Sequence, residues 1–413
     1  MITVDWQRGK KIVANVREWK EKFHQVYEPI PSPDGEKIAA VVEVDKGQCS
    51  VCINNKTWEQ TFERISFPSF STSGSFICLV LQNYEWTLAE EGKTLEETFD
   101  YAWNLKCHPK NNSIAFNIKK GDLYGVCLNG KAWDNLFFDA RETFISPNGK
   151  TSASYVRVKN PPLLDIFSFK EGVWTLAVNG EAWPMSFLSV YGCTFSEGDK
   201  VAATVRLGQQ EFSVVTDGKI WGETFLNAWE GVFVDDSTFA VPAKTEKGWS
   251  LIVNGKPEWK TFTQLWHPQV GPDKRIAAVV CTEFGKWTVA VNGEPWKITF
   301  SQAVLPPFFS ANGKHIAALV REKDKWTVAI DGKAWEKGFE RIWSPQFNPE
   351  GNHVIAKVEI ANEYYLAIDG RIRAEKYERM WEPIFSPDGK KILLRYVKEG
   401  HYIREVLTLE ELL

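Results

Sequence analysis

The chain has 413 residues, of which 44% are hydrophobic and 25% are charged, the ordinary balance of a globular protein. Its 49 Lys and Arg residues stand against 53 Asp and Glu residues, and the net charge of −4 argues against nucleic-acid binding through a net basic charge. Tryptophan is the unusual component, with 19 Trp residues beside only 3 Met residues. The fold must account for those tryptophans.

The sequence predicts neither a membrane span nor an export signal. The longest apolar stretches, such as residues 276–281, are far shorter than the roughly 18 residues of a membrane-spanning helix. Charges near the N-terminus are not followed by the apolar part of a signal peptide, so we expect a cytoplasmic protein. The 7 Cys residues are scattered, and Cys49 and Cys52 have no second pair to complete a metal site. We expect them to be buried strand thiols.

Residues 10–26 begin the chain with the second half of a unit that then repeats. A complete unit has a short strand, a turn of the Ser-Pro-Asp-Gly type and an apolar strand such as residues 38–42. A strand of the Trp-Thr-Val type, an Asn-Gly or Asp-Gly turn and a strand from Trp to Phe follow, as in residues 326–339. Asn-Gly is a strong hairpin signal because both residues accept the positive φ of a type I′ turn. Each unit therefore predicts a four-stranded antiparallel meander.

The second turn of each unit fixes the period. Its first residue is Asn54, Glu91, Asn129, Asn179, Asp217, Asn254, Asn292, Asp331 and Asp369. These positions are about 38 residues apart, except for the longer step from Asn129 to Asn179. A period near 38 with four strands is typical of a propeller blade.

An insertion of about a dozen residues, at about 157–171, explains the long step. It contains two prolines followed by an apolar run. Because a protruding apolar loop often marks a docking surface, we assign partner docking to Leu163, Leu164, Ile166, Phe167 and Phe169. The alternative is that the loop folds back over the end of a blade.

The C-terminal residues 385–404 match the first half and the third strand of a unit. Pairing them with the N-terminal strand would complete a split blade and leave no open sheet edge. We therefore predict an all-β fold, a β-propeller of about ten four-stranded units in a single repeat domain over residues 1–413. Two smaller propellers remain the alternative.

The tryptophans fall in register with the units. One set begins the third strands, one follows the Asn-Gly turns, and one lies between units: Trp103, Trp229, Trp266, Trp343 and Trp381. Packing between blades is the first interpretation, because each ring buries roughly 150–250 Å². A ligand-stacking rim or a redox relay through the last set is the alternative.

Catalytic and cofactor motifs are not found. The sequence has no G-x-S-x-G elbow, no phosphate loop, no H-E-x-x-H and no C-x-x-C-H. The 6 His residues are dispersed over different units. His108, His267 and His315 lie near first turns and could converge on a metal, although turn or surface positions are the first interpretation. We predict no enzyme, no catalytic residue, no metal and no cofactor.

The Ser-Pro-Asp-Gly turns resemble those of TolB-like and WD40-like propellers. The repeated pattern Trp-Thr-Val-Ala-Val-Asn-Gly-x-x-Trp-x-x-x-Phe, as at residues 287–300, resembles the tryptophan-rich D subunits of the Tmc transmembrane electron-transfer complexes of sulfate-reducing bacteria. That resemblance implies an accessory subunit on the cytoplasmic side of the inner membrane. It also implies protein partners, namely a membrane cytochrome b and a cytoplasmic iron–sulfur subunit. It supplies no catalytic motif.

Three functions follow from these observations. The first is a non-catalytic scaffold that docks on a membrane-associated redox complex without crossing the membrane. The second is a small-ligand binder or enzyme that uses the propeller channel. The third is electron transfer through tryptophan.

Overall fold

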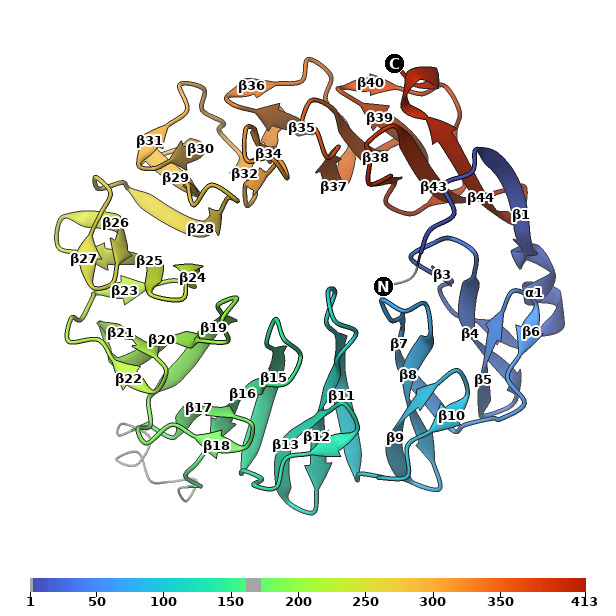
Figure 1. Ribbon diagram of the computed structural model, residues 1–413, viewed down its shortest axis with the longest axis horizontal. Helices are drawn as coiled ribbons and strands as arrows, with labels where there is room; N and C mark the ends of the chain where they lie inside the picture. The colour runs from blue at the N-terminus through green and yellow to red at the C-terminus, as the bar shows by residue number, and fades with distance from the viewer. Residues whose placement is uncertain (1–2, 161–171) are drawn as a thin grey trace. The chain divides into compact units, whose positions relative to one another are not determined.

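The computed structural model describes residues 3–160 and 172–413, and contacts divide the chain into two compact units. Unit 1 contains Glu18–Phe239, and unit 2 contains Asp5–Arg17 and Ala240–Leu413. Ten antiparallel sheets follow one another along the chain as the blades of a β-propeller (Figure 1). The prediction of an all-β propeller with about ten four-stranded blades is confirmed.

Five blades lie in unit 1. Their strands are β2 (Gln25–Val26), β3 (Ile30–Pro31), β4 (Ile38–Asp45), β5 (Gln48–Ile53) and β6 (Lys56–Thr57); β7 (Arg64–Phe70), β8 (Phe76–Gln82), β9 (Glu85–Glu90) and β10 (Lys93–Thr94); β11 (Tyr101–Cys107), β12 (Ile114–Lys120), β13 (Leu123–Leu128) and β14 (Lys131–Ala132); β15 (Asp139–Ile145), β16 (Ser152–Arg157), β17 (Trp174–Val178) and β18 (Glu181–Ala182); β19 (Ser189–Phe195), β20 (Val201–Gly208), β21 (Glu211–Thr216) and β22 (Lys219–Ile220). In the blade that begins at β2, the first strand is divided into two short segments, β2 and β3.

The sixth sheet contains the residue at which the units divide. Its strands are β23 (Asn227–Ala228), β24 (Val232–Asp235), β25 (Thr238–Thr245), β26 (Gly248–Val253) and β27 (Lys256–Pro257). The blades of unit 2 are β28 (Gln264–Val270), β29 (Ile276–Glu283), β30 (Lys286–Val291) and β31 (Glu294–Pro295); β32 (Ala303–Val304), β33 (Phe308–Phe309), β34 (Ile316–Glu322), β35 (Lys325–Ile330) and β36 (Lys333–Ala334); β37 (Arg341–Phe347), β38 (Val354–Ile360), β39 (Glu363–Ile368) and β40 (Arg371–Ile372); β41 (Arg379–Met380), β42 (Ile384–Phe385), β43 (Lys391–Lys398), β44 (His401–Thr408) and β1 (Gly9–Asn15). Two short helices, α1 (Val16–Lys22) and η1 (Leu409–Glu411), complete the described elements.

The termini meet in the last blade, all within unit 2. β1 pairs antiparallel with β44, so the N-terminal segment supplies the fourth strand of a sheet whose other strands come from the C-terminus. The predicted pairing of the terminal strands is confirmed. It covers the edge of β44, whose backbone donors and acceptors would otherwise be unpaired.

The Asn-Gly turns act through both backbone and side chain. Asn129 and Gly130 have φ of 50° and 80°, as a type I′ turn requires. The Asn129 side chain also accepts a hydrogen bond of 2.9 Å from the backbone N–H of Ile114, the first residue of the second strand. Asn54, Asn179 and Asn292 make the same contact. The turn residue therefore ties the end of the third strand to the start of the second strand.

The fourth strands are shorter than predicted. Only two residues pair regularly with the third strand, and an isolated bridge such as that between Trp287 and Phe300 ends the segment. Between these points the third-strand hydroxyl replaces the missing backbone bonds. Thr288 Oγ1 donates to the carbonyl of Ile298 at 2.6 Å, and Ser213 Oγ donates to that of Glu223 at 2.9 Å. This explains the Thr or Ser that follows the third-strand aromatic position in these blades.

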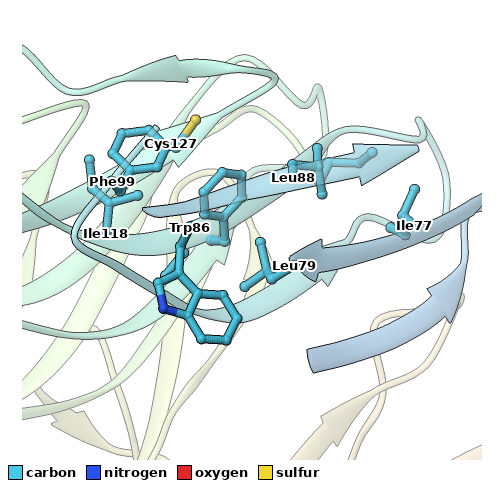
Figure 2. Close-up of a cluster of buried hydrophobic side chains, with 10 residues drawn as sticks. Ile77, Leu79, Trp86, Leu88, Phe99, Ile118 and Cys127 are labelled. Atoms are coloured by element: carbon cyan, nitrogen blue, oxygen red, sulfur yellow. The ribbon is translucent and has the colours of Figure 1, made fainter. Parts of the chain in front are cut away.

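The core lies between adjacent blades. In unit 1, one cluster joins Ile77, Leu79 and Trp86 of one blade to Ile118 and Cys127 of the next (Figure 2). The alternate residues of the same second strand pack against the preceding blade instead. Second strands are therefore buried on both faces, which explains why they are continuous apolar runs rather than alternating ones.

The tryptophans after the Asn-Gly turns pack against the turn of the following blade. A Cβ on Gly180 would lie 3.4 Å from the Cβ of Trp133, and a Cβ on Gly332 would lie 3.4 Å from that of Trp296. The equivalent pairs are Trp58 with Gly92, Trp183 with Gly218, Trp259 with Gly293, and Trp335 with Gly370. Glycine thus serves both the positive φ of the turn and the close approach of the indole. The interpretation of these residues as blade packing is confirmed.

Candidate functional site

Four of the tryptophans between units have aromatic partners inside their own blades, and the fifth, Trp229, is 40% exposed. Each of the four packs against the aromatic residue near the start of the third strand, as Trp266 does on Trp287, with ring centroids 4.7 Å apart. The other pairs are Trp103 with Tyr124, Trp343 with Tyr364, and Trp381 with Tyr402, at centroid distances of 6.1, 5.6 and 5.7 Å. Within-blade packing therefore accounts for these four without a redox role.

The first strands carry a repeated bulge that accounts for several buried polar residues. The bulge residue has a positive φ, as in Asn104, Glu142 and Gly192. A bulge leaves backbone groups outside the ladder, and side chains of the preceding blade bind there. Tyr155 Oη accepts a hydrogen bond from the backbone N–H of Cys193 at 2.8 Å, and Asn117, which is fully buried, accepts one from Thr143. These polar groups are structural.

The histidines and cysteines are placed by the repeat as well. His315 and His353 each pair through Nδ1 with the Asp of the neighbouring turn, Asp331 and Asp369, at 2.6 and 2.7 Å. All seven Cys are free and lie in strands, five of them buried. In residues 3–160 and 172–413, no three His, Cys, Asp or Glu side chains come together as metal ligands.

Burial controls the acidity of the thiols. It raises the pKa of Cys78 and of Cys193 far above the usual range, and it raises the pKa of Cys127 to about 12. Because the thiolate is the reactive form, these three thiols are poor nucleophiles at neutral pH.

The blades expose different residues at their two ends. An antiparallel meander places the Pro-Asp-Gly and Asn-Gly turns at one end, and the second-to-third-strand turns with the links between blades at the other. We call the second end the connection face. In unit 1, three consecutive blades carry four exposed apolar side chains at this face: Tyr84 at 87% exposure, Tyr101 at 46%, Phe138 at 39% and Leu123 at 36%; a fifth, Leu226 at 38%, lies on the link that follows β22.

These four residues depart from the repeat. Positions equivalent to Tyr84 in other blades hold Gly47, Asp122, Asp324, Asn362 and Gly400. Those equivalent to Phe138 are polar in six blades, at Glu63, Asp100, Thr263, Ser301, Glu340 and Glu378, and apolar in two, at Leu188 and Leu226. Tyr101 corresponds to Arg64, Asp139 and Arg341, and Leu123 corresponds to Glu85, Lys325 and Glu363. The fold therefore does not need an apolar residue at these positions. All four belong to three consecutive blades, whose second strands are β8, β12 and β16.

Tyr101 belongs to a row of aromatic rings that crosses between two of these blades. Its centroid lies 5.4 Å from that of Trp86 in the preceding blade and 5.6 Å from that of Trp103. Trp103 in turn contacts Tyr124, over whose ring the Lys119 ammonium lies at 5.8 Å. The row fixes the orientation of Tyr101, so the exposed ring is a rigid feature rather than a freely rotating side chain.

The docking residues predicted in the insertion, Leu163, Leu164, Ile166, Phe167 and Phe169, lie outside the described residues. Their role stays a prediction. The strands that flank the insertion are described: β16 ends, and β17 begins, at the connection face. Sequence reasoning chose the insertion for its composition and missed the four exposed residues, whose signal is their departure from the other units.

No known family model matches the chain, and no curated protein matches its sequence. The fold is similar to that of a eukaryotic initiation factor, at 12% identity with a TM-score of 0.46, covering 90% of this chain and 96% of that one. It is also similar to the Dos1 propeller, at 10% identity with a TM-score of 0.37, covering 96% of this chain and 95% of that one. A puromycin-hydrolysing peptidase of Mycobacterium tuberculosis has 12% identity and a TM-score of 0.37, covering 87% of this chain and 61% of that one. Such likenesses concern the fold alone.

No helix in the described parts of the chain is long and apolar enough to cross a membrane.

Proposed function

We propose that the protein is a non-catalytic scaffold and that a protein partner binds the connection face of unit 1. The observation that carries this proposal is the group of exposed apolar residues Tyr84, Tyr101, Leu123 and Phe138, which the repeat does not require. A propeller holds such residues on rigid blades, so a partner binds with little loss of conformational freedom. Tyrosine suits this role because it offers a large apolar ring with a polar end.

The proposed occupant is an apolar protein surface rather than a charged one. The side chains at this face combine two phenol rings with Leu123 and Phe138, whereas the equivalent positions of other blades are mostly charged or small. The strands that flank the predicted docking insertion in sequence, β16 and β17, end and begin at this face. Apolar residues concentrated over three adjacent blades favour a contact with one partner.

The narrower proposal is that the partners are subunits of a membrane-associated electron-transfer complex, docked on its cytoplasmic side. It rests on the sequence resemblance to the tryptophan-rich Tmc subunits. In this proposal the membrane cytochrome b and the iron–sulfur subunit carry the redox cofactors, and this chain holds them in place.

The experiment is gentle purification of the tagged protein from detergent-solubilised cells, with wild type and two variants compared side by side. Tyr84→Ser combined with Tyr101→Ser removes both exposed rings from the face. Phe284→Ser is the matched control, because Phe284 is 98% exposed on the corresponding turn of a unit 2 blade. We expect the double variant to lose at least 90% of the copurified partner and the control to retain it.

Two results would oppose the proposal. Equal partner recovery with the folded double variant would show that the partner does not bind the connection face. Wild-type protein without any stoichiometric partner would oppose the scaffold itself. Partners other than cytochrome b and iron–sulfur subunits would leave the scaffold in place and overturn the redox assignment.

A further inference from the structure

Unit 1 contains a cavity of about 360 Å³ at the end of the blades opposite the connection face. It lies between the last residues of three successive first strands, β11, β15 and β19. Its walls include Phe144, Ile145 and Phe195, and Lys106 and Cys107 come from the first of the three strands. This volume is in the range of pockets that bind small molecules.

A departure from the repeat explains why space is present here. Cys107 forms the last cross-strand pair before the first turn of its blade, with Ile114. At the same register five other blades have phenylalanine: Phe70, Phe195, Phe309, Phe347 and Phe385. In one of them the ring packs edge-on against the second strand, with the Phe70 and Phe76 centroids 5.1 Å apart. Cys107 has no ring to fill that volume, so its blade leaves an opening.

Lys106 supplies the one ammonium group among the residues that line the cavity. Lys106 is exposed, and its Nζ lies 5.1 Å from the centroid of the Phe144 ring. It forms no ion pair with any residue that the structure describes. The lining residues include no carboxylate. The nearest acidic group in sequence, Glu142, is exposed on the bulge of β15, and both Glu142 and Lys106 influence the Cys193 thiol.

Other polar groups of the cavity are already engaged. Thr143 donates its hydroxyl to Asn117 at 2.8 Å, and the backbone N–H of Cys193 donates to Tyr155. His108 Nδ1 accepts from the backbone N–H of Lys110 at 3.2 Å. The ammonium of Lys106 and the Nε2–H of His108 are therefore the side-chain donors that remain, and the rest of the surface is largely apolar.

We propose that this cavity binds a small organic acid with an aromatic or branched apolar body. The carboxylate would accept hydrogen bonds from Lys106, and the apolar body would occupy the space left by Cys107, against Phe144 and Phe195. This proposal is independent of the scaffold, because the cavity and the connection face lie at opposite ends of the same blades.

The test uses phenylacetate as the probe and phenylacetamide as its neutral counterpart, with binding measured by ligand-observed saturation-transfer NMR. Two variants take residues that other blades already hold at the same positions, which favours an intact fold. Lys106→Gln matches Gln269 and Gln346, and Cys107→Phe matches Phe70. Far-UV circular dichroism and thermal midpoints establish that both variants are folded.

We expect phenylacetate to bind at least fivefold more tightly than phenylacetamide to the wild type. Lys106→Gln should remove that preference, and Cys107→Phe should abolish binding of both probes. Tyr84→Ser, at the opposite end, should change nothing. Equal binding of acid and amide, retained binding in Cys107→Phe, or failure of the wild type to bind either probe would each overturn the proposal.

Discussion

Trp133 gives the most direct measure of how much the interblade tryptophans stabilise the fold. Its side chain is buried in a cluster with Ala140, packs on Gly180 and donates through Nε1 to the Ser152 hydroxyl at 2.9 Å. Trp133→Ala removes a ring of roughly 150–250 Å² and leaves a cavity, so we expect a loss of about 4 kcal/mol in the free energy of unfolding. Trp133→Phe keeps most of the packing and leaves Ser152 Oγ without its donor, which costs about 2 kcal/mol.

The assay is urea unfolding followed by far-UV circular dichroism at constant protein concentration. Tyr84→Ala is the control, because a side chain that is 87% exposed should contribute within about 0.5 kcal/mol. A Trp133→Ala variant within about 1 kcal/mol of the wild type would refute the claim that these residues hold the blades together. A Trp133→Phe variant as damaged as Trp133→Ala would show that the hydrogen bond, rather than the packing, is dominant.

Three further predictions concern pH, thiols and the terminal strand. The hydrogen bond from Ser386 Oγ holds the pKa of Asp388 below its usual value. The stabilisation from this carboxylate is therefore present above pH ~4 and is lost as the pH falls through the lower folded-state pKa. Asp388→Asn, the residue found in the equivalent turns at Asn148 and Asn312, should make the thermal midpoint less sensitive to pH between pH 6 and pH 3, and an unchanged sensitivity would contradict this. Iodoacetamide should label Cys49 and Cys107, the partly exposed thiols, well before the other five in native protein; uniform labelling in peptide mass spectra would show that the blades open readily. Deleting residues 1–15 should leave the edge of β44 unpaired and cause concentration-dependent aggregation, whereas unchanged light scattering would mean that this edge needs no cover.

The repeat made most of the fold predictable. Asn129–Gly130 identifies a type I′ hairpin because few other residue pairs accept two positive φ values. The spacing of such turns then fixes strand number and blade length. The terminal pairing was also predictable, since residues 10–26 and 385–404 are complementary parts of one unit.

Other features depend on contacts that a local pattern does not contain. Trp19 was assigned to the second half of a unit, yet it lies in the short helix α1 and donates through Nε1 to Asn55. The fourth strands are shorter than expected because hydroxyls such as that of Thr288 replace ladder bonds. The bulges beside Glu142 and Gly192 follow from the fit between neighbouring blades.

The candidate sites were less predictable than the fold. Tyr84 lies in a turn and Tyr101 in a strand, and neither belongs to a motif; they differ from the equivalent residues of other units and are exposed at the same end of adjacent blades. In sequence, Cys107 looks like one more buried strand thiol. The strand pairing shows that it occupies the position that Phe70 holds in another blade. Alignment of the units against one another would have found both departures.

The central claim, that a protein partner binds the connection face of unit 1, is tested most directly by site-specific photocrosslinking in intact cells. A photoreactive phenylalanine analogue is placed at position 84, at position 101, or at position 284 as the control on unit 2. We expect the same crosslinked partner from positions 84 and 101 and no crosslink to that partner from position 284. A partner captured from position 284 but from neither position 84 nor position 101 would contradict it.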